Sequence, residues 1–143
     1  MDLLFSLPER PSIPVAGCSA RFPVGRIFCV GRNYAAHAIE MGRDPNKEPP
    51  FFFQKNADNV IEAGQVFPYP PLTNDLHFEI ELVVALSKGG VNIPTEKALD
   101  HVFGYAVGLD MTRRDLQLSE RAHQRPWDLG KDVEQSAVLS KIT

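Results

Sequence analysis

Apolar and polar residues alternate in short runs along this chain, and turn residues separate the runs. The 12 prolines and 10 glycines are spread over the whole sequence of 143 residues. Such a pattern is typical of short strands joined by turns, and it predicts strands near residues 12–15, 26–31, 51–55, 59–62, 77–87 and 103–110. It predicts helices at about 34–41 and 96–101, the latter with Thr95 as N-cap, and a helical or turn-like segment at 112–124. We therefore expect an α+β fold that is rich in strands.

The run from His77 to Leu86 organises this prediction. Its second half is continuously apolar, which is typical of a strand buried on both faces. Alternate residues of a strand point the same way, so Glu79 and Glu81 share one face at the start of the run. Two neighbouring carboxylates repel and lose hydration, and a shared proton, a basic side chain or a metal ion must offset that cost.

A third carboxylate, Asp110, ends the apolar strand predicted at 103–110. Three carboxylates without a Cys or His pattern beside them form a hard oxygen site, which suits Mg²⁺ or Mn²⁺ better than Zn²⁺. The alternative is that Glu79 and Glu81 lie on the wet face of an edge strand. His77 fits a surface or supporting position better than a ligand position.

A second candidate group lies on the helix predicted at 34–41. His37 and Glu40 are three residues apart and share a face of that helix. A carboxylate that holds a histidine fixes its tautomer and raises its basicity, as a general base for water requires. The alternative is an ordinary pair of surface side chains.

Basic residues near such a site would bind an anionic substrate, and the alternative for each is a solvated surface charge. The candidates are Arg32, Lys55, Arg113, Arg114 and Lys131. The aromatic run 51–53 is predicted to lie in the core, and the segment 127–132 is predicted to be a polar loop.

Composition narrows the class of protein. The formal net charge of −3 gives no basic surface for nucleic acid. Cys18 and Cys29 lack a CxxC spacing, so we expect two reduced thiols, with a disulfide as the less favoured alternative. The first ten residues lack the basic, apolar pattern of a signal peptide, and no run approaches the ~20 apolar residues of a membrane span. These features favour a cytoplasmic protein.

Several segments together resemble the fumarylacetoacetate hydrolase family, in the family's order and spacing. They are Phe28–His37 with Glu40, Pro50–Lys55, Asp75–Leu82, Gly104–Gln117 and Gly130–Lys131. The resemblance implies a strand-rich α+β roll of mixed sheets that is incomplete at the C-terminus. It implies that 25–143 form the N-terminal two-thirds of one catalytic domain. The prolines of residues 1–24 predict that this segment is extended.

The resemblance also implies roles for single residues. It implies Mg²⁺ or Mn²⁺ held by Glu79, Glu81 and Asp110. It implies His37 as base and Glu40 as its orienting partner. The substrate-binding residues that it implies are Arg32, Arg114, Gln117 and Lys131, with a lid around residues 41–50.

The implied reaction is hydrolysis of a carbon–carbon bond in a small anionic 2,4-diketo acid, fumarylpyruvate being the best match, by a homodimer. The products would be pyruvate and a carboxylic acid, a step in aromatic compound catabolism. Oxaloacetate decarboxylation and 2-hydroxy-dienoate isomerisation at the same site remain alternatives. So does a family member that binds metal without catalysis.

Overall fold

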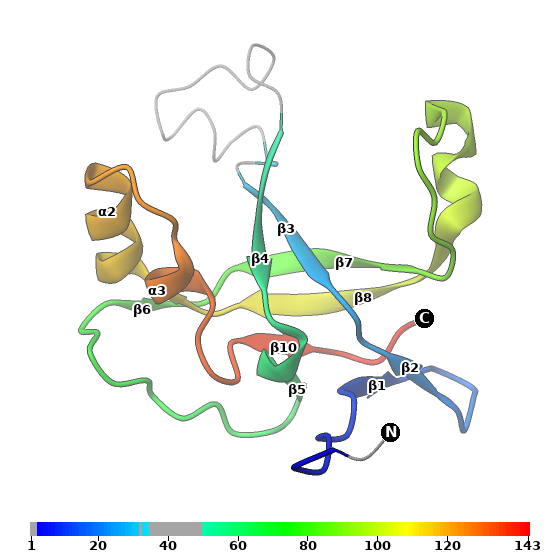
Figure 1. The fold of residues 1–143 in the computed structure, drawn as a ribbon, viewed down its shortest axis with the longest axis horizontal. Helices are drawn as coiled ribbons and strands as arrows, with labels where there is room; N and C mark the ends of the chain where they lie inside the picture. Colours follow the sequence, from blue (N-terminus) through cyan, green and yellow to red (C-terminus); the bar gives the residue numbers. More distant parts are fainter. Residues whose placement is uncertain (1–2, 32, 35–49) are drawn as a thin grey trace.

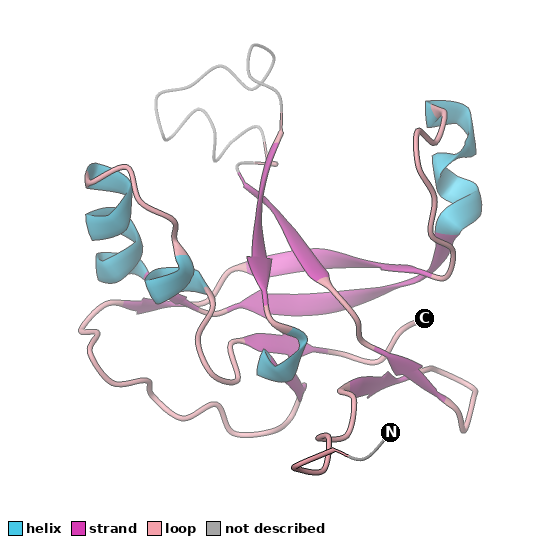
Figure 2. Ribbon diagram, viewed as in Figure 1, coloured by secondary structure: helices cyan, strands magenta, loops and turns pink. Residues whose placement is uncertain are grey.

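Figure 1 shows the fold in a computed structural model that describes residues 3–31, 33–34 and 50–143. Most regular elements among them are strands (Figure 2). The strands are β1 (Ser12–Pro14), β2 (Arg21–Pro23), β3 (Ile27–Gly31), β4 (Phe51–Lys55), β5 (Val60–Glu62), β6 (Leu76–His77), β7 (Ile80–Leu86), β8 (Val102–Asp110), β9 (Thr112–Arg113) and β10 (Ala137–Leu139). The helices are the 3-10 helices η1 (Ala57–Asn59) and η2 (Thr95–His101) and the α-helices α2 (Arg114–Ala122) and α3 (Asp128–Lys131). The predicted α+β class, with mixed sheets and a few short helices, is confirmed.

A four-stranded sheet in the order β5-β10-β8-β7 forms the centre of the molecule. β10 runs parallel to β5 and antiparallel to β8, and β8 runs antiparallel to β7. The inner face of β8 carries the small residues Gly104, Ala106 and Gly108, because the end of the chain packs closely against it. A Cβ atom at Gly104 would lie 2.6 Å from Ile142 Cγ2 and 2.8 Å from the Thr143 carbonyl oxygen, so this position requires glycine.

The β3–β4 pair crosses the inner face of the central sheet (Figure 1). Ile27 of β3 packs against the buried apolar cluster. That cluster consists of Ile13, Val24, Ala85, Ala106, Leu139 and Ile142. The crossing brings Lys55, at the end of β4, within 2.9 Å of Asp110, at the end of β8. The ends of two strands that are far apart in sequence thus meet at one place.

The opposite face of β7 and β8, which we call the outer face, is apolar and exposed. It consists of Phe78, Ile80, Leu82, Val84, Leu86, Tyr105 and Val107, which are between 43% and 67% exposed. The predicted burial of the apolar second half of the run from His77 to Leu86 on both faces is therefore wrong, because Leu82, Val84 and Leu86 are exposed on the outer face. The prediction of a single strand is also wrong, since the ladder breaks between β6 and β7.

Other predictions fail locally. Thr95 lies inside η2, whose N-cap is Pro94, so Thr95 is not a cap. The predicted polar loop at 127–132 contains the short helix α3. The aromatic run is only partly core: Phe52 is 59% exposed, because alternate residues of β4 point away from the sheet that it crosses. β2 and β10 are strands of three residues that the sequence pattern did not reveal.

Cys18 and Cys29 are both free, so the disulfide alternative is excluded and the expectation of two thiols is confirmed. Across the described ranges, every helix is too short or too polar to cross a membrane.

Candidate active site

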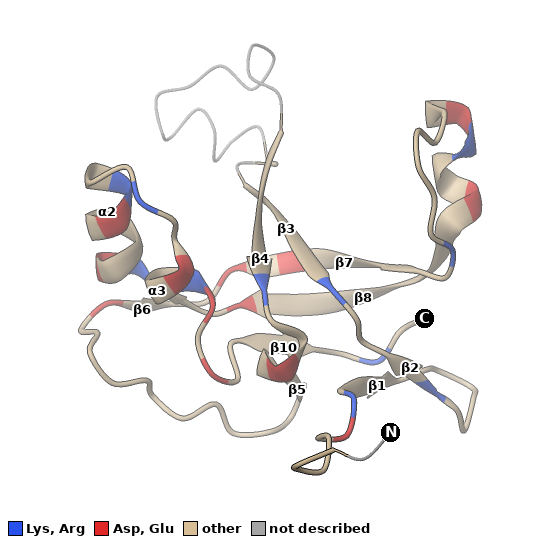
Figure 3. Ribbon diagram, viewed as in Figure 1, with Lys and Arg blue, Asp and Glu red and all other residues tan. Residues whose placement is uncertain are grey.

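Backbone pairing brings three carboxylates to one end of the central sheet. The Asp110 N–H donates to the Glu79 carbonyl at 2.8 Å, and the Glu79 N–H donates to the Asp110 carbonyl at 3.3 Å. Glu81 lies opposite Gly108 in the same ladder, on the same face as Glu79. Figure 3 shows these acidic positions on β7 and β8 beside basic positions of α2 and α3. The two backbone hydrogen bonds between Glu79 and Asp110 explain why these two predicted site residues lie side by side.

The ammonium group of Lys131 lies between two of these carboxylates. Its Nζ donates to Glu79 Oε2 at 2.6 Å, to Asp110 Oδ2 at 2.7 Å and to Thr112 Oγ1 at 2.7 Å. An ammonium has three N–H donors, so all are used. Lys131 is only 2% exposed, and the two ion pairs compensate for the burial of its charge.

A second buried lysine approaches Asp110 from the opposite side. Lys55 Nζ donates to Ser136 Oγ at 2.9 Å, to the Met111 carbonyl at 3.1 Å and to the Lys131 carbonyl. Asp110 Oδ1 lies 2.9 Å from Lys55 Nζ as an ion pair but receives no hydrogen bond from the residues that the structure describes. The reason is that the three protons of Lys55 already point at other acceptors. Burial lowers the pKa of Lys55, and the charge of Asp110 opposes that shift.

The helix α2 supplies the third cation of the site. Arg114, its first residue, pairs with Glu79 Oε1 and donates to Gln117 Oε1 one turn later. Gln117 in turn packs on Gly130 of α3, where a Cβ atom would lie 2.7 Å from the Gln117 backbone nitrogen. Glycine at this position lets α2 and α3 approach, and the approach brings Arg114 and Lys131 to the same carboxylate.

Glu79 and Glu81 therefore have different environments. Burial acts to raise the pKa of Glu79, but Lys131 and Arg114 outweigh it and hold the pKa below the ordinary 4.5. Burial raises the pKa of Glu81, and the charges of Asp110 and Glu79 raise it further. Glu79 is stabilised as a carboxylate, whereas Glu81 lacks a strong cationic partner in the described part of the chain.

These carboxylates fit a hard divalent cation in their chemistry. All three offer oxygen ligands, Asp110 Oδ1 has its ion pair with Lys55 but no hydrogen bond from the described residues, and Glu81 has a surplus of negative charge around it. They do not form a finished cage, since no three acidic, His or Cys side chains of residues 3–31, 33–34 and 50–143 are placed to hold a metal ion. The cation that bridges Glu79 and Asp110 here is the ammonium of Lys131.

One wall of the site is aromatic. The Phe53 ring lies 5.0 Å from Lys131 Nζ and 5.7 Å from the Trp127 ring centroid. Cys29 pairs with Phe53 in the β3–β4 ladder and so shares its face. Burial, together with the charge of Asp110, raises the pKa of the Cys29 thiol to about 12, so it is not a nucleophile.

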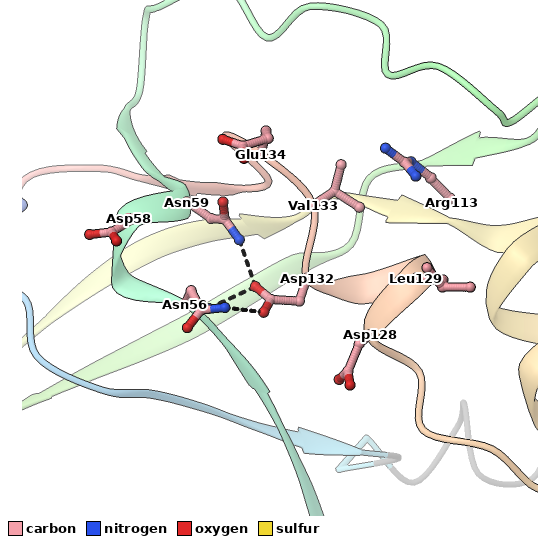
Figure 4. A pocket seen from close by; sticks show the side chains of 9 residues that line it. All are labelled: Asn56, Asp58, Asn59, Arg113, Asp128, Leu129, Asp132, Val133 and Glu134. Carbon is pink, nitrogen blue, oxygen red and sulfur yellow. Dashed lines mark hydrogen bonds between the residues drawn. The ribbon is translucent and has the colours of Figure 1, made fainter.

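A separate pocket of about 440 Å³ is lined by residues of η1 and α3 (Figure 4). Its lining is Asn56, Asp58, Asn59, Arg113, Asp128, Leu129, Asp132, Val133 and Glu134, and it includes none of the three carboxylates above. Asp132 accepts hydrogen bonds from the Asn56 backbone N–H at 2.7 Å and from Asn59 Nδ2 at 2.6 Å. Through these bonds Asp132 holds η1 against α3, so its role is structural.

The structure thus gathers five of the predicted site residues: Glu79, Asp110, Arg114, Gln117 and Lys131, with Glu81 beside them. The predicted pair His37 and Glu40 and the binding residue Arg32 lie outside the described residues, as does the lid predicted around 41–50 except for its last residue. The sequence pattern marked Lys55 only as one of five basic residues that could bind an anionic substrate, and it did not single out Thr112 or Ser136. The available signal for Lys55 was its spacing of two from Phe53, which places both on the inward face of β4.

Comparison with known proteins supplies the family. The profile described as "Fumarylacetoacetate (FAA) hydrolase C-terminal" matches residues 26–143. The chain belongs to the fumarylacetoacetate hydrolase family. A Ralstonia fumarylpyruvate hydrolase is 47% identical over 104 residues, which are 71% of this chain and 54% of the relative. A mitochondrial oxaloacetate tautomerase of Arabidopsis thaliana is 39% identical over 117 residues, or 82% of this chain and 52% of the relative.

Among solved structures, the chain is similar to fumarylpyruvate hydrolase from Pseudomonas aeruginosa in complex with Mn²⁺ and pyruvate. The identity is 52% and the TM-score is 0.92, over 99% of this chain and 62% of the other. The chain therefore has the fold of this family. It spans about half the length of the curated relatives that it matches.

Proposed function

We propose that this chain carries the site of a metal-dependent hydrolase that cleaves the carbon–carbon bond of an acylpyruvate, with fumarylpyruvate as the preferred substrate. The observation that carries the proposal is the cluster of Glu79, Glu81, Asp110 and Lys131 at one end of the sheet. It occurs in a chain 52% identical to a fumarylpyruvate hydrolase crystallised with Mn²⁺ and pyruvate.

Glu79, Glu81 and Asp110 would hold Mg²⁺ or Mn²⁺. When bound, the ion supplies a Lewis acid that stabilises negative charge on a 2-keto acid and orients it. Three carboxylates carry one negative charge more than a divalent cation neutralises. The surrounding cations Lys55, Lys131 and Arg114 offset this excess and leave positive charge for an anionic substrate.

Lys131 and Arg114 with Gln117 would bind the carboxylate and keto oxygens of the substrate, and Arg32 would assist them. Lys131 already uses all three donors, so binding requires its ammonium to exchange one carboxylate contact for a substrate oxygen. Arg114 uses two of its five N–H groups on Glu79 and Gln117, so it has donors to spare. The Phe53 and Trp127 rings would exclude water from one side.

His37, oriented by Glu40, would take a proton from water. The resulting hydroxide attacks the 4-keto carbon, and the bond between C3 and C4 breaks. Its electron pair stays on C3, which takes a proton to give pyruvate, while the acyl fragment leaves as a carboxylic acid. We expect the positive charge of Lys131 to help stabilise the negative charge that develops on the leaving pyruvate.

A substrate panel with a single variant tests this proposal. We expect the chain with Mn²⁺ to form pyruvate from fumarylpyruvate faster than it consumes oxaloacetate or a 2-hydroxy-dienoate. His37→Ala is expected to abolish turnover while leaving Mn²⁺ binding within about twofold, because histidine is not among the proposed ligands. A faster reaction with oxaloacetate would favour the decarboxylase or tautomerase alternative. Near-normal turnover by His37→Ala would exclude His37 as the base.

We also infer that a second copy of the chain covers the outer face. Its seven side chains present an uncharged surface on the order of 800 Å², about what each partner buries in a standard interface. A two-fold interface brings the same surface of both copies together, and the outer face has no like charges to repel one another. Sedimentation should give a dimer, and Leu82→Arg should give a monomer. A wild-type monomer would refute the inference.

A reducing compartment such as the cytoplasm suits the two free thiols.

A further inference from the structure

Lys55 is a buried cation of the site, and its ammonium group connects four segments of the chain. The residue is only 3% exposed. It donates to Met111 beyond β8, to Ser136 before β10 and to the main chain of Lys131 in α3. Because β4 carries Lys55, one ammonium joins β4 to α3 and to the segments that follow β8 and precede β10.

Its fourth neighbour is Asp110. Oδ1 of Asp110 faces Lys55 at 2.9 Å, and Oδ2 faces Lys131 at 2.7 Å. The two lysines therefore hold opposite oxygens of one carboxylate. They differ in freedom, because Lys55 is fixed by three acceptors of the protein scaffold, whereas two of the three acceptors of Lys131 are carboxylates of the candidate site.

We propose that Lys55 is a positioning residue that fixes Asp110 and the backbone of Lys131, so that the Lys131 ammonium can leave Asp110 for a ligand. The inference rests on the proposed function for the identity of that ligand. Without Lys55, Lys131 would be the sole neutralising partner of a buried carboxylate and would stay there. Lys55 touches neither substrate nor reacting atoms in this role and acts through Asp110 and Lys131.

Lys55→Met provides the test, because methionine has similar length without charge. The matched control is Lys97→Met, since Lys97 is 65% exposed and has only a 3.9 Å contact to Asp100. The first measurement is Mn²⁺ affinity by electron paramagnetic resonance. The second is the nitrogen-15 resonance of the Lys131 ammonium in metal-free protein.

The sign of the first result separates positioning from simple charge. Removing a positive charge beside a cation site would by itself tighten Mn²⁺ binding. Loss of positioning weakens it, and we expect about tenfold weaker binding, as for other residues that orient metal ligands. Lys97→Met should leave the affinity unchanged. Equal or tighter binding by Lys55→Met would overturn the proposal.

The second result decides the proposal independently of the metal. The Lys131 ammonium resonance should shift in Lys55→Met and stay in place in Lys97→Met. If the wild type bound no Mn²⁺, the proposed function would fail. If the Lys131 resonance did not move in Lys55→Met, the role of Lys55 would fail, whether or not the wild type bound Mn²⁺. Should Lys55→Met not fold, Ser136→Ala removes one acceptor of Lys55 and keeps the charge. It should shift the resonance in the same direction by a smaller amount, and no shift would refute the inference.

Discussion

Replacing Lys131 by methionine tests whether the buried ammonium stabilises the carboxylate cluster. Removing one partner of a buried ion pair costs about 3–5 kcal/mol, because the other charge stays buried without its partner. Here Glu79 keeps Arg114 and Asp110 keeps Lys55. We therefore expect a smaller cost than this, a loss of about 2–3 kcal/mol in the free energy of unfolding. For a chain of this size, that corresponds to a melting temperature about 5–10 °C lower.

The assay is urea denaturation of metal-free protein with EDTA, at pH 7 and at several lower pH values. The pKa of Glu79 is depressed in the folded state, so its stabilisation is present above the unfolded value and is lost as the pH falls through the folded value. Lys131→Met has less of this stabilisation to lose. The difference between wild type and variant should therefore narrow as the pH falls below about 4.5, the ordinary value for glutamate.

Two controls make the result specific. Lys97→Met repeats the chemical change at an exposed lysine and should leave stability within about 0.5 kcal/mol of wild type. The double variant with Glu79→Gln should lose less than the sum of the single variants, because the two side chains interact directly. A cost below about 1 kcal/mol, or a cost that does not change with pH, would refute the stabilising role of Lys131.

Three further predictions follow from neighbouring positions. Glu81→Gln should raise the free energy of unfolding of metal-free protein at pH 7, because the raised pKa of Glu81 shows that its negative charge is unfavourable in the folded state. The same variant should lose Mn²⁺ binding in a titration followed by electron paramagnetic resonance. A destabilised variant that binds Mn²⁺ normally would contradict both expectations. Gly130→Ala should cost about 1–3 kcal/mol in urea unfolding, since the new methyl group meets the backbone of Gln117, and a neutral result would mean that α2 and α3 adjust freely. At pH 8, a thiol reagent should modify exposed Cys18 and spare Cys29, whose pKa is raised to about 12; equal rates, followed by mass spectrometry, would contradict the raised pKa.

The sequence predicted the elements whose signals are local. Prolines, glycines and alternation located β3, β4 and β8, and the period of two placed Glu79 and Glu81 on one face. It could not predict that β7 leaves one face exposed, since an apolar run has the same letters whether or not another surface covers it. β10 has three residues, and its identity as a strand comes from β5 and β8 on either side.

The site was predictable as a set of residue types and not as a network. The carboxylates could be recognised in the sequence because buried like charges require compensation. Lys55 was only one of five basic candidates, because a lone lysine after an aromatic run is ordinarily a surface residue. Only the crossing of β3–β4 over the sheet brings it to Asp110, and sequence spacing contains no information about that crossing.

Anomalous scattering from crystals of the chain soaked in Mn²⁺ would locate the metal centre. We expect one strong peak bounded by the carboxylates of Glu79, Glu81 and Asp110, with the Lys131 ammonium displaced from its present position between Glu79 and Asp110. Absence of a peak there, or a peak only in the acidic pocket around Asp58 and Asp132, would contradict the assignment of this cluster as the metal centre.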